Sequence, residues 1–122
     1  MNIQINTDKN IRGNKTLIAK FSRIIKSALS RMSDNITRVE VHLSDENGAK
    51  SGKNDKRCMI EARLEGRQPI VVTDDAATLN QALDGAIDKL LNMIESILGR
   101  QKDRRRRKAK QSTHDLIFPE EL

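Results

Sequence analysis

Hydrophobic and polar residues alternate in four segments of the chain, which predicts four β-strands with one buried and one solvent-exposed face. The segments are residues 3–5, 36–47, 56–66 and 70–73. In the second segment the apolar positions are Val39, Val41 and Leu43, and in the third they are Cys58, Ile60, Ala62 and Leu64. The stretch 47–55 contains two glycines and little that could be buried, so it predicts a mobile hairpin loop.

Two longer segments repeat apolar residues at intervals of three and four, which is the spacing of an amphipathic helix. The first runs from about residue 14, and its apolar stripe consists of Leu17, Ile18, Phe21, Ile24, Ile25, Ala28, Leu29 and Met32. The second is expected to open at residues 73–75, whose side chains can cap free backbone amides, and to stop at Gly99. Its apolar stripe consists of Leu79, Leu83, Ala86, Ile87, Leu90, Leu91, Ile94, Ile97 and Leu98.

The resulting order, β-α-β-β-β-α, places the chain in the α+β class. Two amphipathic helices packed on one face of a four-stranded, largely antiparallel sheet bury every apolar stripe and leave the other sheet face in water. We therefore expect a two-layer sandwich over residues 1–99. Residues 100–122 lose the helical periodicity, and we expect them to form a basic tail that is disordered when free.

Positive charge is concentrated in two places. The 122 residues include 23 Lys and Arg against 17 Asp and Glu, and residues 100–110 alone hold eight basic side chains against Asp103. On the first helix, the cations opposite the apolar stripe include Lys15, Lys20, Arg23 and Lys26. Such clusters attract polyanions by releasing their counterions, so nucleic acid or an anionic surface is the expected partner class. For the tail alone, a solubility segment is the alternative.

Several function classes lack the residues that they need. No apolar run approaches the roughly 20 residues of a membrane span, and the first residues lack signal-peptide features, so we expect a cytoplasmic protein without membrane contact. The glycines do not match a phosphate-binding loop, and Cys58 and His42 fall on opposite faces of the predicted sheet. Asp74 and Asp75 stand where helix caps are expected. We therefore expect no enzyme activity, metal, cofactor or small-molecule substrate.

The aromatic residues limit how the chain can bind RNA. Phe21 lies on the apolar stripe of the first helix and Phe118 in the tail, and Tyr and Trp are absent, so bases cannot stack on the sheet. The expected mode is phosphate contact and shape recognition by the cationic helix face. On the second helix, Asp84, Asp88 and Glu95 either pair with those cations or limit the RNA footprint, and both interpretations stay open.

Three segments in this order, VEVHLSDENG, KRCMIEARLEGRQPIVVT and above all LNQALDGAIDKL, resemble one known family. It is the ribosome hibernation promoting factor and ribosome-associated inhibitor family, also called sigma-54 modulation or ribosomal S30AE proteins. The resemblance covers about residues 1–98 and is to the short form, because the dimerising C-terminal domain of long members is missing. It implies a non-enzymatic protein without a cofactor. Such a protein binds the small ribosomal subunit in the messenger and transfer RNA channel and blocks translation under stress. We expect a monomer when free.

The resemblance also implies which residues contact ribosomal RNA. Family members use basic residues on the first helix and at the end of the second, which match Lys15, Lys20, Arg23 and Lys26, and Lys89 within IDKL. The chain then departs from the family, because LNMIESILG replaces the usual basic helix end. Its cations come later, and we add them to the RNA-binding set: Arg100, Lys102, Arg104, Arg105, Arg106, Arg107 and Lys108.

A second function class remains open beside the ribosome interpretation. It is a non-enzymatic interaction module that acts through the exposed sheet face and the C-terminal DLIFPEEL segment. RNA dependence separates the two classes, because an interaction module should keep its partner after nuclease treatment.

Overall fold

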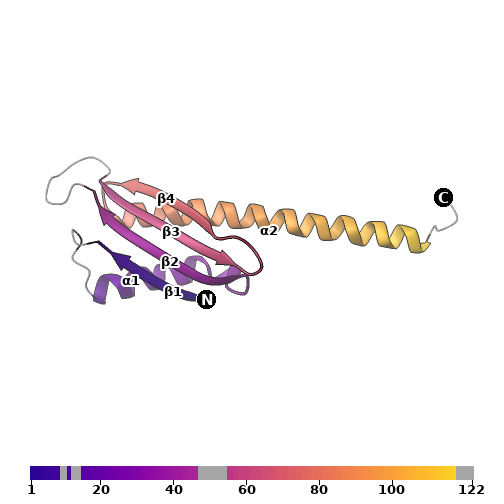
Figure 1. The fold of residues 1–122 in the computed structure, drawn as a ribbon, viewed down its shortest axis with the longest axis horizontal. Helices are drawn as coiled ribbons and strands as arrows, with labels where there is room; N and C mark the ends of the chain where they lie inside the picture. Colours follow the sequence, from indigo (N-terminus) through magenta and orange to yellow (C-terminus); the bar gives the residue numbers. More distant parts are fainter. Residues whose placement is uncertain (9–10, 12–14, 47–54, 118–122) are drawn as a thin grey trace. The chain divides into compact units, whose positions relative to one another are not determined.

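The computed structural model describes the backbone of residues 1–8, 11, 15–46 and 55–117, and side chains as far as Arg100 (Figure 1). Residues 47–54 of the predicted hairpin loop 47–55, and the last five residues, lie outside the described part. The chain divides into two compact units, Met1–Leu91 and Asn92–Leu122. The first unit contains a four-stranded sheet, and the second is helical over its described residues.

The four predicted strands are all present: β1 (Asn2–Thr7), β2 (Ile36–Asp45), β3 (Lys56–Leu64) and β4 (Ile70–Ala76). Their spatial order is the same as their order along the chain, so β1 and β4 are the edges. β1 pairs with β2 in parallel, with Ile3 beside Val39, and the other two pairings are antiparallel. The α+β class and the element order are confirmed.

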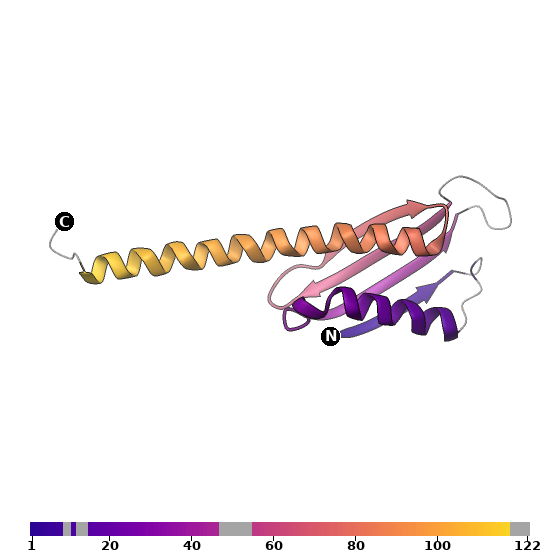
Figure 2. The ribbon, with the colours of Figure 1, turned by 180° about the vertical axis from the view of Figure 1, so that it is seen from behind.

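Two helices cover one face of this sheet (Figures 1 and 2). α1 (Lys15–Ala28) is followed by the 3-10 turn Ser30–Met32, and α2 (Leu79–Ile117) begins after β4. The core lies between the layers, and its largest fully buried side chains include Phe21, Ile25, Leu29, Val39, Val41, Leu43, Ile60, Leu83 and Leu90. The predicted apolar stripes of the helices and the inward-facing positions of β2 and β3 supply these residues, because burying them is the main driving force for the packing.

The predicted start of α2 is wrong, because β4 continues through Ala76 and the helix begins at Leu79. Asp75 lies beside Arg57 in the register of β3 and β4, and its Oδ1 atom accepts a 2.9 Å hydrogen bond from Arg57 Nε. This ion pair joins the ends of both strands. The cap comes instead from Thr78, whose Oγ1 accepts a 3.1 Å hydrogen bond from the backbone amide of Gln81.

The predicted end of the same helix at Gly99 is also wrong. The backbone is helical through Ile117, so the helix continues into the basic segment. That residues 100–122 are disordered when free stays a prediction. A glycine inside a helix costs only about 1 kcal/mol relative to alanine, and the following residues include many Arg, Lys and Gln, which favour helix.

Asp74 connects the inner side of β4 to α2 through an ion pair with Lys89. It lies opposite the fully buried Cys58 in the sheet, so its side chain is directed to the helix layer. Lys89 Nζ lies 2.9 Å from Asp74 Oδ1 and donates a 2.7 Å hydrogen bond to the backbone carbonyl of Thr73. Gly85 faces the same carboxylate, and a Cβ atom at position 85 would overlap it. The glycine of the LDGAIDKL segment therefore permits the close approach of β4 to α2.

We predict that Gly85→Ala lowers the free energy of unfolding by about 1–3 kcal/mol, the usual range for overpacking at a close contact. In an Asp74→Ala background the same substitution should instead raise stability by up to about 1 kcal/mol, because alanine favours the helix. Urea unfolding of the four proteins measures both effects. An equal effect of Gly85→Ala in the two backgrounds would contradict the proposed overlap.

Cys58 gives a second prediction, because burial and, to a lesser extent, the charge of Asp74 raise the pKa of its thiol from 9.0 to about 12. Between these values the unfolded chain loses the thiol proton and the folded chain keeps it. The free energy of unfolding should therefore fall as pH rises from 9.0 to about 12, by up to about 1.4 kcal/mol per pH unit. Cys58→Ala should remove this part of the alkaline slope. Urea unfolding of both proteins at about pH 8 and about pH 10 tests it, and identical slopes would contradict it.

Candidate nucleic-acid interface

The side of α1 that faces away from the core carries the predicted cations. Lys15, Lys20, Arg23 and Lys26 are all exposed, whereas Phe21 and Ile25 on the opposite side are completely buried. None of the four cations forms an ion pair with a carboxylate of the described residues. The core packing of α1 therefore presents four unneutralised positive charges to the solvent on one short helix.

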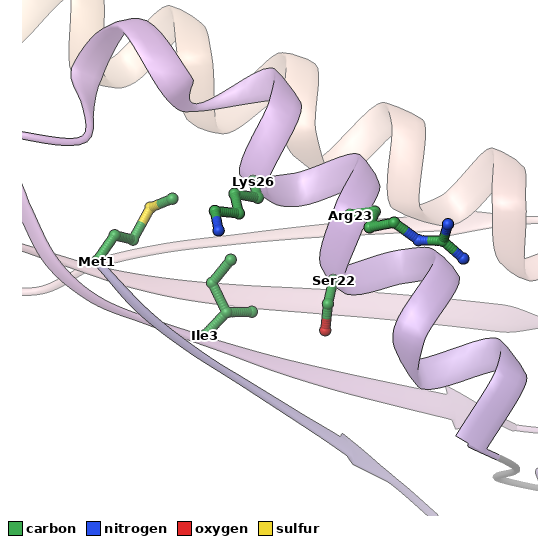
Figure 3. Close-up of a pocket in the computed structure, with 5 residues that line it drawn as sticks. All are labelled: Met1, Ile3, Ser22, Arg23 and Lys26. Atoms are coloured by element: carbon green, nitrogen blue, oxygen red, sulfur yellow. The ribbon is translucent and has the colours of Figure 1, made fainter.

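Two of these cations stand beside a groove between α1 and β1 (Figure 3). The groove has a volume of about 350 Å³ and is lined by Met1, Ile3, Ser22, Arg23 and Lys26. Met1 and Ile3 point from β1 toward α1, and Ser22 points from α1 toward the strand (Figure 3). Lys26 reaches over the space between Met1 and Ile3. The Arg23 guanidinium lies along its own helix, with Nε 3.5 Å from the carbonyl oxygen of Ala19.

A second hollow of about 300 Å³ continues the groove along α1 toward the 3-10 turn. Met1 and Lys26 belong to both hollows, and Ser30 and Ser33 complete the second. Among the described residues, no carboxylate lines either hollow. Their walls therefore combine an apolar floor, three hydroxyl groups and two cations.

Lys89 does not join this surface. Its ammonium group is held at Thr73 and Asp74 on β4, whereas α1 lies against β1 at the opposite edge of the sheet. The Lys89 side chain is still 54% exposed, so an anion could reach it. Its position is nevertheless set by an intramolecular ion pair that sequence spacing did not reveal.

The basic run lies on the C-terminal half of α2. Arg100 is exposed, and residues 101–117 have a helical backbone. At about 1.5 Å per residue, the eleven residues from Arg100 to Lys110 extend along roughly 16 Å of helix. The predicted residues Lys102, Arg104, Arg105, Arg106, Arg107 and Lys108 lie on this helix, and their side chains are outside the described part.

Two acidic residues of α2, Asp84 and Asp88, do not neutralise α1 within the described structure. Asp84 and Asp88 are exposed, and neither forms an ion pair with a described cation of α1. Of the two interpretations left open by the sequence, pairing is therefore not observed for these two residues. They leave the cations of α1 available to an external anion.

The outer sheet face carries rows of like charge across β2 and β3. Arg38 lies directly opposite Arg63, and Glu40 directly opposite Glu61. Arg38 Nη2 is 3.8 Å from Glu40 Oε1, so the rows partly compensate each other along the strand. The sequence pattern did predict this polar face, but not the pairing of like charges, which depends on the register between strands.

The described residues offer little for catalysis. They contain no group of three or more His, Cys, Asp or Glu side chains arranged to hold a metal ion. Cys58, the one cysteine of the chain, is completely buried with a raised pKa. No helix within the described part is long and apolar enough to cross a membrane.

The groove between α1 and β1 was not predicted from the sequence. Ile3 was correctly placed on the inward face of a strand, but nothing in the periodicity shows that α1 lies against this strand or that Ser22 faces it. The cations Arg23 and Lys26 were predicted, and the apolar floor beside them was not.

Comparisons with known proteins agree with this architecture. The crystal structure of the Thermus thermophilus Protein Y N-terminal domain is similar over 80% of this chain and 99% of its own, with 26% identity and a TM-score of 0.62. A ribosomal subunit interface protein from Coxiella burnetii has the same fold over 81% of this chain and 99% of its own, with 15% identity and a TM-score of 0.63. A comparison of the sequence with curated proteins finds no match.

The family model described as "Sigma 54 modulation protein / S30EA ribosomal protein" matches residues 7–106. The match includes α1, strands β2–β4 and α2 well into the basic run. Since it spans most of the sequence and agrees with the fold, this chain belongs to the sigma-54 modulation protein and S30EA ribosomal protein family.

Proposed function

We propose that this protein is a ribosome-associated translation regulator that binds the small ribosomal subunit through ribosomal RNA. The observation that carries the proposal is the solvent-exposed, unneutralised cationic side of α1, in a chain of a ribosomal protein family. Lys15, Lys20, Arg23 and Lys26 would contact RNA phosphates and so release the counterions bound there.

The proposed mechanism is occupancy of a binding site. The domain would lie in the channel of messenger and transfer RNA, and its volume would exclude both under stress or in stationary phase. This mechanism needs no catalytic group and no cofactor. It fits a cytoplasmic protein that acts as a single copy.

The two parts of the chain would have separate tasks. Residues 1–99 would dock on the subunit, and the basic segment within residues 100–122 would attract the RNA from a distance. The helical backbone of residues 100–117 would present that charge on a rod of defined length. Lys89 would add a contact at the β4 edge, limited by its ion pair with Asp74.

The outer sheet face supports a second candidate function, a protein-interaction module. Like charges directly opposite each other destabilise a sheet, and the pairs Arg38–Arg63 and Glu40–Glu61 would be relieved by a partner with complementary charges. Nuclease treatment separates the candidates, because a protein partner held by the sheet face and the C-terminal segment would remain bound after the RNA is removed.

We predict that the protein co-sediments with small subunits or whole ribosomes and that its affinity falls steeply with salt. Each phosphate contact contributes a slope of about −0.7 to −0.9 to the plot of log affinity against log salt. Four α1 cations should therefore give a slope near −3 or steeper. Gradient sedimentation of a lysate at several salt concentrations, followed by detection of the protein, measures this. Binding that does not change with salt would exclude the electrostatic mechanism.

The triple substitution Lys20→Glu, Arg23→Glu and Lys26→Glu should lower subunit affinity at least about a hundredfold, because it replaces three favourable phosphate contacts with repulsion. Each exposed helix charge contributes only about 0.2–0.5 kcal/mol to stability, so the thermal midpoint should change little. Binding to purified small subunits, with circular dichroism as the folding check, measures both quantities.

A matched control has the same change in net charge on the other side of the molecule: Arg38→Glu, Arg57→Glu and Arg63→Glu on the outer sheet face. It should retain most of the wild-type affinity at moderate salt. If the two triple variants lose equal affinity, net charge alone decides binding and α1 is not the docking surface. If only the control loses binding, the sheet face is the functional surface.

A further inference from the structure

The groove between β1 and α1 has features that phosphate contact alone does not require. A cationic helix can neutralise RNA without a cavity, yet here an apolar floor formed by Met1 and Ile3 lies directly beneath Lys26 (Figure 3). We infer that this groove binds one unpaired RNA nucleotide, with its phosphate at Lys26 and Arg23 and its sugar and base against Met1 and Ile3. The inference rests on the proposed function and names a subsite within the same surface.

The chemistry of the lining favours an anionic occupant with an apolar part. Lys26 and Arg23 are exposed cations without a carboxylate partner among the described residues, and no carboxylate lines the groove. The hydroxyl groups of Ser22 and Ser33 can donate to phosphate or sugar oxygens, and that of Ser30, which donates to the Ser27 carbonyl, can accept from a sugar hydroxyl. A nucleotide combines a phosphate, a hydroxyl-bearing sugar and an apolar base face in one unit.

The dimensions suit one nucleotide with a short stretch of chain beside it. The main hollow of about 350 Å³ is near the lower end of small-molecule pockets, which measure about 300–1,000 Å³. The adjoining hollow of about 300 Å³ shares Lys26 with it, so the strand can continue past Ser30 and Ser33. Arg23 and Lys26 are about 4.5 Å apart along the helix axis, so they can serve neighbouring phosphates of one strand.

The apolar floor distinguishes an unpaired nucleotide from a helical one. Bases in an RNA duplex are stacked, so a protein reaches mainly their edges, the phosphates and the 2′-hydroxyls. Met1 and Ile3 can contact a base face only if that base has left the stack.

An acidic peptide is the other occupant that the charges would accept, and the helix as a whole favours RNA over it. The cations Lys15 and Lys20 continue the positive side of α1 beyond the groove, which matches the regular charge of a nucleic-acid strand. The serine hydroxyls also match the many oxygen acceptors of a sugar-phosphate chain. The peptide becomes one outcome of the test.

The experiment fills the groove without changing its charge. Ser22→Phe places a large side chain in the groove. The matched control Ser27→Phe places the same side chain at an exposed position that is turned about 140° around the helix from Ser22. The probe is a fluorescein-labelled hexauridylate, and its binding to the full chain is measured by fluorescence anisotropy at low salt. We expect Ser22→Phe to weaken binding about tenfold and the control to change it less than about twofold.

A duplex of the same length tests the unpaired state. Wild-type protein should bind it more weakly than hexauridylate, and Ser22→Phe should leave duplex binding unchanged. Equal losses in the two serine variants, or an equal loss on duplex and single strand, would overturn the inference. So would displacement of the probe by an oligoglutamate peptide as effectively as by unlabelled hexauridylate.

A second measurement does not depend on how well Ser22→Phe folds. Hexauridylate that carries 4-thiouridine is crosslinked to the wild-type chain by light, and the crosslinked peptide is mapped by mass spectrometry. Crosslinks at residues 1–3 or 22–33 support the inference, and crosslinks confined to residues 100–110 refute it. Ribosome co-sedimentation of the wild type and of Ser22→Phe distinguishes failure of the subsite from failure of the proposed function. If wild type co-sediments but the groove result is negative, only the subsite fails. If wild type does not co-sediment, the proposed function itself fails.

Discussion

The burial of the apolar stripe of α1 against the sheet is the constraint on which the functional surface depends. Phe21 and Ile25 are completely excluded from water, and each contributes on the order of 1.5–3 kcal/mol when it is buried. Exposed ion pairs contribute about 0–1 kcal/mol, so charges cannot determine the orientation of this helix. Hydrophobic packing sets the rotation of α1, and the positions of Lys20, Arg23 and Lys26 follow from it.

The same argument explains why the first helix and the middle strands could be predicted from the sequence. Their apolar residues recur with the period of one secondary structure, and the core selects the face on which they lie. Val39 and Val41 in β2, and Phe21 and Ile25 in α1, were assigned to the buried side and are completely buried. Periodicity succeeds where burial is the dominant energy.

The predictions failed where a short residue pattern is compatible with more than one local structure. Asp74 and Asp75 are residue types that often cap a helix, yet they extend β4 and pair with Lys89 and Arg57, which are distant in sequence. Glycine often follows the last residue of a helix, which is why the sequence predicts an end at Gly99. A glycine ends a helix, however, only where the residues after it do not favour helix. The groove beside α1 was missed for a related reason, since its floor and its wall come from segments that only the fold brings together.

β1 pairs in parallel with β2, and Ile3 lies beside Val39. The strand to which β1 is hydrogen-bonded therefore comes after α1 in the sequence. The N-terminus of a nascent chain leaves the ribosome first, so for some time α1 lies outside the exit tunnel while β2 is still inside it. During that interval the nascent chain already carries the cations of α1, but β1 has no neighbouring strand to hold it against the helix. The positive charge of α1 is therefore exposed before the groove exists, and any RNA bound before residue 39 and its neighbours have emerged would be held by charge alone.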